Sequence, residues 1–270
     1  MAKHTKKKAG FKVAGFEIKQ DYILALLLIV SVALYVQFKH MLFGVASLLL
    51  LLALFLRDAL PASSDSKSIK SSLYELGFAL AAALAVWYGL GFILQTPTPI
   101  DVVTSCSMLP ALDRGDLIIL QGGEIKALEV EVPRTVDFRD FTTSKCNITE
   151  IATGIQRSET CTTGLTINGK TYPFDTSGDI VVYEPNSAFR DLGLVVHRTV
   201  MKLKFKDKVV YLIKGDNNPA PDIFGITQSF AEEEQIKGRT IMRVPYIGYL
   251  KLFLSLQFDE PANCKYIISQ

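Results

Sequence analysis

Histidine is scarce in this sequence, and the residue patterns that usually hold cofactors are absent from it. The chain has three histidines and four cysteines, and none of them falls at the spacing of a metal site. The sequence also lacks a glycine-rich phosphate-binding loop, a Rossmann pattern and internal repeats. We therefore expect no cofactor and no metal, and a chemistry carried by ordinary side chains.

Long charge-free blocks near the start of the chain are its first positive feature. The chain is 49% hydrophobic yet 21% charged, and nearly all of the apolar blocks fall in the first hundred positions. A transmembrane helix needs about 20 apolar residues. Tyr22–Phe38 and Met41–Leu56 are marginal in length, whereas Leu73–Leu94 is longer. Because the two shorter blocks are apolar all round, we expect them to insert rather than to lie at the interface, which gives three transmembrane helices within 22–94.

Basic residues set the expected orientation of these helices. Lysines crowd the tail 1–21, and Arg57, Lys67 and Lys70 follow the second block, whereas Gln95–Val103 has no Lys or Arg. Cytoplasmic loops carry the excess of basic residues. We therefore expect a multi-pass protein of the cell membrane with a cytoplasmic tail and an extracytoplasmic chain after the third helix. This topology and anionic lipid explain the basic tail, so we expect no nucleic-acid partner.

From residue 95 to residue 251 the pattern is that of an antiparallel β domain. Short β-branched or alternating runs are separated by Gly, Pro, Asn and Asp. The fold class expected is therefore a mainly β domain anchored by N-terminal transmembrane α-helices. The segment 121–177 matches no motif and is expected to be an insert, in which Asn168-Gly169 predicts a hairpin with a type I′ turn. The expected strands are Leu117–Gln121, Ile180–Tyr183, Leu194–Phe205, Val209–Lys214 and Arg239–Leu250.

The segment 252–270 is an apolar stretch followed by a tail. Alternation permits a final core strand as far as Lys251. The following residues, Leu252–Phe258, are too few to cross a bilayer, but their Leu and Phe side chains suit a membrane surface as well as a protein core. Both locations stay open from the sequence.

The four cysteines all lie after the third apolar block. Cys146 and Cys161 fall in the insert, where a disulfide in an oxidising compartment would stabilise the fold by roughly 3 kcal/mol, unless strain or a reducing habitat cancels it. We expect Cys106 to be a small buried packing residue and Cys264 to be a free thiol.

A candidate nucleophile lies just after the third apolar block. Ser107 stands in the run Ser-Cys-Ser-Met-Leu-Pro, and a serine is a poor nucleophile until a base takes its proton. His4 is in the basic tail and His40 lies between two apolar blocks, so only His197 can share a compartment with Ser107. His197 falls in an apolar, β-branched run typical of a buried strand, which suits an ordinary core histidine as well as a base.

Carboxylates that could orient this histidine follow in a turn-rich loop. Asp216 stands in the run Lys-Gly-Asp-Asn-Asn-Pro, and Asp222 follows six residues later. Asp and Asn beside Gly and Pro are also the ordinary chemistry of a turn. The spacing leaves open which aspartate would orient His197.

Four motifs occur in an order that resembles the type I signal peptidases. They are SCSMLP at 105–110 with Gly115-Asp116, GDIVVY at 178–183, VHR at 196–198 and KGDNN at 214–218. The histidine before Arg198 resembles the archaeal and endoplasmic-reticulum branch, because the usual bacterial enzymes carry lysine there. The resemblance covers roughly residues 104–249, and the insert departs from it.

The resemblance implies a membrane-bound serine endopeptidase that removes N-terminal signal peptides from exported precursor proteins. Ser107 would be the nucleophile and His197 the general base, with Asp216 or Asp222 as the orienting carboxylate. Ser105 would donate its hydroxyl to the oxyanion beside the Ser107 N–H. The implied partners are signal-peptide-bearing precursors and the lipid membrane, with the protein translocation machinery as a candidate.

Three alternatives remain from the sequence. The base is a lysine, drawn from Lys202, Lys204 or Lys214; or the protein is a related membrane-anchored processing protease with other substrates; or it is a catalytically silent β domain that scaffolds a membrane complex. A histidine at the family's base position counts against the first alternative. The complete set of serine, histidine and aspartate counts against the third, whereas the insert leaves the second open.

The expected topology makes a direct prediction. Protease added outside sealed spheroplasts should cut within 121–177, whereas a tag placed between Arg57 and Ile69 should be protected. Immunoblotting of the fragments measures both outcomes. A protected insert together with a digested tag would mean that one of the short apolar blocks does not insert.

Overall fold

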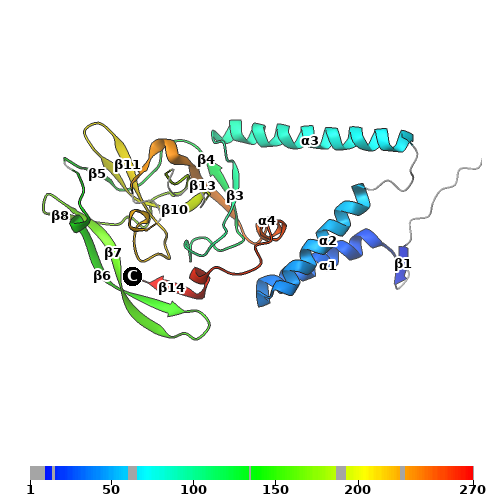
Figure 1. Cartoon of the computed structure of the whole chain (residues 1–270), viewed down its shortest axis with the longest axis horizontal. Coiled ribbons are helices and arrows are strands. Elements are labelled where there is room, and N and C mark those ends of the chain that lie inside the picture. Colours follow the sequence, from blue (N-terminus) through cyan, green and yellow to red (C-terminus); the bar gives the residue numbers. More distant parts are fainter. Residues whose placement is uncertain are drawn as a thin grey trace, which may run out of the picture. The chain divides into compact units, whose positions relative to one another are not determined.

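The chain folds into two compact units in the computed structural model (Figure 1). One unit is Met1–Leu84 with Tyr249–Glu260, and the other is Ala85–Gly248 with Pro261–Gln270. The start of the expected basic tail, including His4, and part of the loop after the second apolar block lie outside the described residues. The structure describes residues 10–13, 16–59, 66–133, 135–186, 193–225 and 229–269.

The first unit is built mainly from helices. Helices α1 (Gln20–Phe38) and α2 (Met41–Ala59) are separated by two residues and pack against each other. Helix α4 (Tyr249–Leu254) belongs to the same unit, where its Phe253 ring lies 4.7 Å from the Tyr35 ring, centroid to centroid. A short hairpin of β1 (Gly10–Val13) and β2 (Phe16–Lys19) precedes α1.

Helix α3 (Ser66–Leu94) contains the longest apolar stretch. Its part Leu73–Leu94 is long and apolar enough to cross a membrane, and none of the 18 residues in its most apolar stretch is buried. The apolar helices at Tyr22–Phe38 and Met41–Phe55 are shorter than that length. Within the described part of the chain, one helix therefore meets the length expected of a span.

The second unit is mainly β, and its main sheet is antiparallel except where β5 pairs with β10. The strand order is β12-β11-β10-β9-β13-β4-β3, with β5 beside β10. Strands β9 and β11 are buried over almost their whole length, as their continuous runs of Val, Ile, Leu and Tyr predict. The strands are β3 (Ile100–Val102), β4 (Leu117–Gln121), β5 (Glu129–Glu131), β9 (Ile180–Tyr183), β10 (Val195–Lys204), β11 (Val209–Lys214), β12 (Ala231–Glu232) and β13 (Ile236–Val244).

Most of the insert belongs to a second sheet, although its strand β5 pairs with β10 of the main sheet. Strands β6 (Phe141–Glu150), β7 (Gln156–Ile167) and β8 (Lys170–Pro173) follow one another as a meander, and β14 (Tyr266–Ser269) pairs with β6. Figure 1 shows β14, in red, beside the green arm of β6 and β7. The turn residues Asn168 and Gly169 have φ values of 51° and 77°, so the predicted type I′ hairpin is confirmed.

The end of the β domain differs from the sequence prediction. The strand expected at Arg239–Leu250 ends before Pro245, which has no N–H for the ladder, and the chain then enters α4. The alternative of a core strand as far as Lys251 is therefore wrong. Leu252 and Phe253 are buried inside the helical unit, so the membrane-surface alternative does not hold for these two side chains.

Both pairs of cysteines form disulfides. The disulfide between Cys146 and Cys161 joins β6 to β7, as the sequence allowed. The expectation of a free thiol at Cys264 is wrong, because Cys264 is bonded to Cys106 across a separation of 158 residues. The pairing of β14 with β6 brings the tail beside the loop of Cys106, which no spacing in the sequence indicates.

Removing the Cys146–Cys161 disulfide should destabilise the hairpin of β6 and β7. The bond closes a loop of 15 residues, which corresponds to at most about 3 kcal/mol. Hydrogen exchange of the β6 and β7 amides in a Cys146→Ala/Cys161→Ala double variant of the full chain measures the change. Amides of β11 serve as the internal control. Unchanged exchange in β6 and β7 would show that the hairpin ladder alone sustains their stability.

Candidate active site

Ser107 lies in the loop between β3 and β4. The next residue, Met108, is fully buried in a cluster with side chains of β4 and β9, which anchors the loop. Behind it, the buried Asp116 carboxylate accepts the Asp113 N–H at 2.7 Å and pairs with Arg243. Burial raises the pKa of Asp116, and these two contacts oppose that shift. The Gly-Asp pair of the motif therefore closes the loop that presents Ser107.

His197 lies on β10 with only 3% of its surface exposed. The antiparallel ladder sets it opposite Val181 of β9. Its Nε2 atom is 2.8 Å from the Ser107 Oγ, and its Nδ1 atom is 2.7 Å from the Asp222 Oδ2. Three side chains from distant parts of the sequence thus form one hydrogen-bonded row, with the imidazole in the middle.

Asp222 holds a second partner that the sequence analysis missed. The residue opens the 3-10 helix Asp222–Phe224 and is 4% exposed. Its Oδ2 atom also accepts the Tyr183 hydroxyl at 2.7 Å. Burial raises the pKa of Tyr183, so its hydroxyl stays protonated and can only donate to a charged carboxylate. A tyrosine at the end of an apolar, β-branched run was the available signal, since a buried hydroxyl needs a partner.

Asp216 lies away from the imidazole. Its two carboxylate oxygens accept Arg198 Nε at 2.8 Å and Nη2 at 2.7 Å, while Arg198 Nη1 donates to the Gly178 carbonyl. The hydrogen bonds from Asp216 raise the pKa of Arg198. The structure therefore separates the two aspartates that spacing left open, with Asp222 on the imidazole and Asp216 on the neighbouring guanidinium.

Two groups near Ser107 are placed to meet a negative charge. The Ser105 Oγ is 3.2 Å from the Ser107 Oγ. The backbone N–H of Ser107 makes no hydrogen bond within the described part of the chain. A free N–H and a hydroxyl beside a nucleophile are the usual components of an oxyanion hole.

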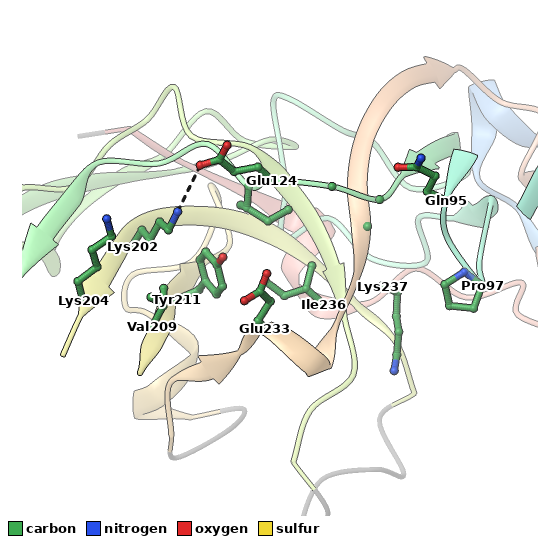
Figure 2. A pocket seen from close by; sticks show the side chains of 14 residues that line it. Gln95, Pro97, Glu124, Lys202, Lys204, Val209, Tyr211, Glu233, Ile236 and Lys237 are labelled. Carbon is green, nitrogen blue, oxygen red and sulfur yellow. Dashed lines mark ion pairs between the residues drawn. The ribbon is translucent and has the colours of Figure 1, made fainter. Parts of the chain in front are cut away.

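The lysines at 202 and 204 belong to a different feature. They line a cavity of about 600 Å³ whose walls include neither Ser107 nor His197. Figure 2 shows both side chains there, with the Lys202 ammonium directed at Glu124, 3.5 Å away. Lys204 pairs with a carboxylate of β5. Neither lysine makes a hydrogen bond to Ser107.

Lys214, the remaining candidate lysine, is buried but is directed elsewhere. Its ammonium donates to the Gly215 carbonyl at 3.2 Å, and it makes no hydrogen bond to Ser107. Burial lowers its pKa, while the charges of Asp216 and Asp222 raise it. The hydrogen-bonded neighbour of the serine is the histidine, not this lysine.

The row of side chains can move a proton without an added group. A proton leaving the Ser107 hydroxyl can pass to His197 Nε2, and Asp222 can stabilise the imidazolium that forms. No three His, Cys, Asp or Glu side chains gather as a metal site among the described residues. The arrangement therefore suits nucleophilic attack by an oxygen on a carbonyl carbon.

Comparison with known proteins gives relatives that share most of their length with this chain. The signal peptidase complex catalytic subunit sec11 of Sclerotinia sclerotiorum is 30% identical over 193 residues, which is 71% of this chain and 84% of the relative. The SEC11 subunits of Metarhizium robertsii and Pyricularia oryzae are each 28% identical with the same coverage. No protein-family model matches the chain. Its length coverage, identity and motif order show that the chain belongs to the family of signal peptidase complex catalytic subunits.

Proposed function

We propose that this protein is a membrane-bound serine endopeptidase that removes N-terminal signal peptides from exported precursor proteins. Its relatives carry the name of signal peptidase catalytic subunits. The observation that supports the mechanism is the hydrogen-bonded row. In it the Ser107 Oγ is 2.8 Å from the His197 Nε2, and the His197 Nδ1 is 2.7 Å from the Asp222 Oδ2.

In this mechanism Ser107 is the nucleophile and His197 is the general base. The Nε2 atom takes the hydroxyl proton as Oγ attacks the scissile carbonyl, and then returns it to the leaving amine. Asp222 accepts the Nδ1–H, which keeps the Nε2 lone pair directed at Ser107. The Tyr183 hydroxyl holds the same carboxylate oxygen and so restrains its rotation.

The oxyanion of the tetrahedral intermediate would be held by the Ser107 N–H and the Ser105 hydroxyl. Donors that are in place before the charge develops stabilise the transition state more than the ground state. The Ser105 Oγ lies 3.2 Å from the nucleophilic oxygen, on the side chain two residues before it. This geometry supports a hydroxyl contribution to the oxyanion hole.

The anchoring we propose consists of three transmembrane helices within 22–94, after the basic tail 1–21. The apolar exposed face of Leu73–Leu94 supports one of them. For the α1–α2 hairpin, the support is that Ser31 and Ser47 bond each other between the helices at 3.0 Å. Polar groups paired inside a hairpin leave an apolar exterior, which lipid tolerates.

The catalytic domain, 95–251 with its insert, would then lie outside the membrane, together with the end of the segment 252–270, whose strand β14 pairs with β6. The connector from Leu94 to Ser107 reaches at most about 45 Å when fully extended, so the site stays near the outer membrane surface. Precursors that emerge there during translocation are the partners we propose, with the translocation machinery close by. The relatives are named as subunits of a complex, which supports partner subunits.

Ser107→Ala and His197→Ala should each abolish cleavage of a model secretory precursor in detergent or vesicles. Both residues act as one unit, so each loss should approach about 10⁶-fold in kcat. Circular dichroism and membrane fractionation control for folding and insertion. A His197→Lys variant with near-normal rates would contradict a site built around an imidazole.

Substitution of Asp222 and of Asp216 should have different effects on kcat. Asp222→Asn keeps the side-chain shape but favours the wrong imidazole tautomer, so kcat should fall by about 10⁴-fold with little change in Tm. Asp216→Asn removes a charge from Arg198 and should mainly lower the stability, by roughly 1–3 kcal/mol. Single-turnover rates and thermal melts measure the contrast. Equal losses of rate per folded molecule would contradict the assignment of Asp222.

A further inference from the structure

The side chain of Asn217 lies fully buried behind the loop of the candidate nucleophile. Its amide nitrogen faces three carbonyl oxygens, those of Tyr266 at 2.9 Å, Cys106 at 3.0 Å and Asn263 at 3.3 Å. Its amide oxygen accepts the Ile268 N–H at 2.8 Å. Only one orientation of the amide satisfies these contacts, because the reverse would set its oxygen against three other oxygens.

The backbone of the same residue holds the other side of the nucleophile. The Asn217 N–H donates to the Ser107 carbonyl at 2.7 Å. This approach depends on Gly215, where an added Cβ would stand 2.7 Å from the Ser107 carbonyl oxygen. Asn217 thus binds two successive carbonyls of the nucleophile loop. Its side chain donates to the Cys106 carbonyl, and its backbone N–H donates to the carbonyl of Ser107 itself.

The hydrogen bond from Asn217 to the Cys106 carbonyl also sets the direction of the Ser107 N–H. The two groups belong to one peptide unit, which is planar and trans, so they point in opposite directions from the same plane. A hydrogen bond that fixes the carbonyl therefore fixes the N–H. That N–H has no partner in the described structure, which leaves it available for an oxyanion.

The contacts of Asn217 depend on the tail of the chain. Three of its four side-chain partners come from Asn263, Tyr266 and Ile268. The disulfide from Cys106 to Cys264 and the pairing of β14 with β6 hold this tail in place. The amide is therefore fixed on one side by the tail and acts on the nucleophile loop on the other.

We propose that Asn217 is a positioning residue for catalysis: by holding the Cys106 carbonyl it aims the Ser107 N–H at the oxyanion. This inference rests on the proposed function of Ser107 as the nucleophile. Asn217 touches no reacting atom and acts through the peptide bond in front of Ser107. Its effect should therefore appear in the rate of the chemical step and not in substrate binding.

The test uses the full-length protein in detergent with Asn217→Ala and Asn217→Asp, and with Asn218→Ala as the matched control. Asn218 is in the same loop and its side chain makes none of these contacts. A fluorophosphonate probe reports the rate at which Ser107 is phosphonylated, and the end-point of labelling counts the folded sites. A short peptide substrate gives kcat and KM per labelled site.

Asn217→Ala should lower the labelling rate and kcat about 10- to 100-fold per site with KM unchanged, because a misdirected donor loses part of the roughly 10²- to 10³-fold that one oxyanion donor supplies. Asn217→Asp should lose at least as much, since an oxygen then faces the Cys106 carbonyl. Asn218→Ala should stay within about twofold of wild type, because the half-buried Asn218 side chain holds neither carbonyl beside Ser107.

A normal rate per labelled site in Asn217→Ala, with only fewer sites labelled, would overturn the proposal and leave Asn217 a purely structural residue. Failure of the proposed function looks different. Wild-type protein that labels rapidly at Ser107 but cleaves no precursor would refute the substrate, while the labelling rates of the variants would still decide the role of Asn217. Wild-type protein that does not label at Ser107 would refute both.

Discussion

The register of β10 is the constraint on which the rest of the site depends. His197 must meet Ser107 with one ring nitrogen and Asp222 with the other, so its side chain has one useful direction. Because side chains alternate along a strand, a slip by one residue would send the imidazole to the opposite face of the sheet. Pairing on both flanks, with β9 and with β11, prevents that slip.

Charge separation around the imidazole follows from the same strand. The residue after His197 is Arg198, which points the other way and takes both oxygens of Asp216. One aspartate is thereby neutralised by a permanent cation, and Asp222 is left to respond to the imidazole. A buried carboxylate without a partner would be costly, and each of the two has its own. The neighbouring positions thus place one acidic group in an ion pair with Arg198 and the other in the hydrogen-bonded row with His197.

Local sequence patterns were enough to predict the strands and the hairpin. The remaining features depend on packing between residues that are distant in the sequence. The runs 180–183 and 209–214 are strands over the residues predicted, because buried β-branched sequence has few other solutions. The choice between Asp216 and Asp222 depends on which side of β10 each loop reaches, and spacing holds no such information. The pairing of Cys106 with Cys264 and the role of Tyr183 depend on the same three-dimensional arrangement. The alternation of side chains in the sequence continues past Pro245, but proline has no N–H for the ladder and the strand ends before it.

The C-terminal residues that contact Asn217 are synthesised after all the other residues of the site. A ribosome makes Ser107, His197 and Asp222 before it makes the groups at 263–268 that complete the amide's hydrogen bonds. Until those residues have been made and Cys264 has formed its disulfide with Cys106, the nucleophile loop lacks this covalent tie to the C-terminal segment. The hydrogen bonds of the Asn217 amide and the covalent tie of the nucleophile loop are therefore completed only after Ser107, His197 and Asp222 have all been synthesised.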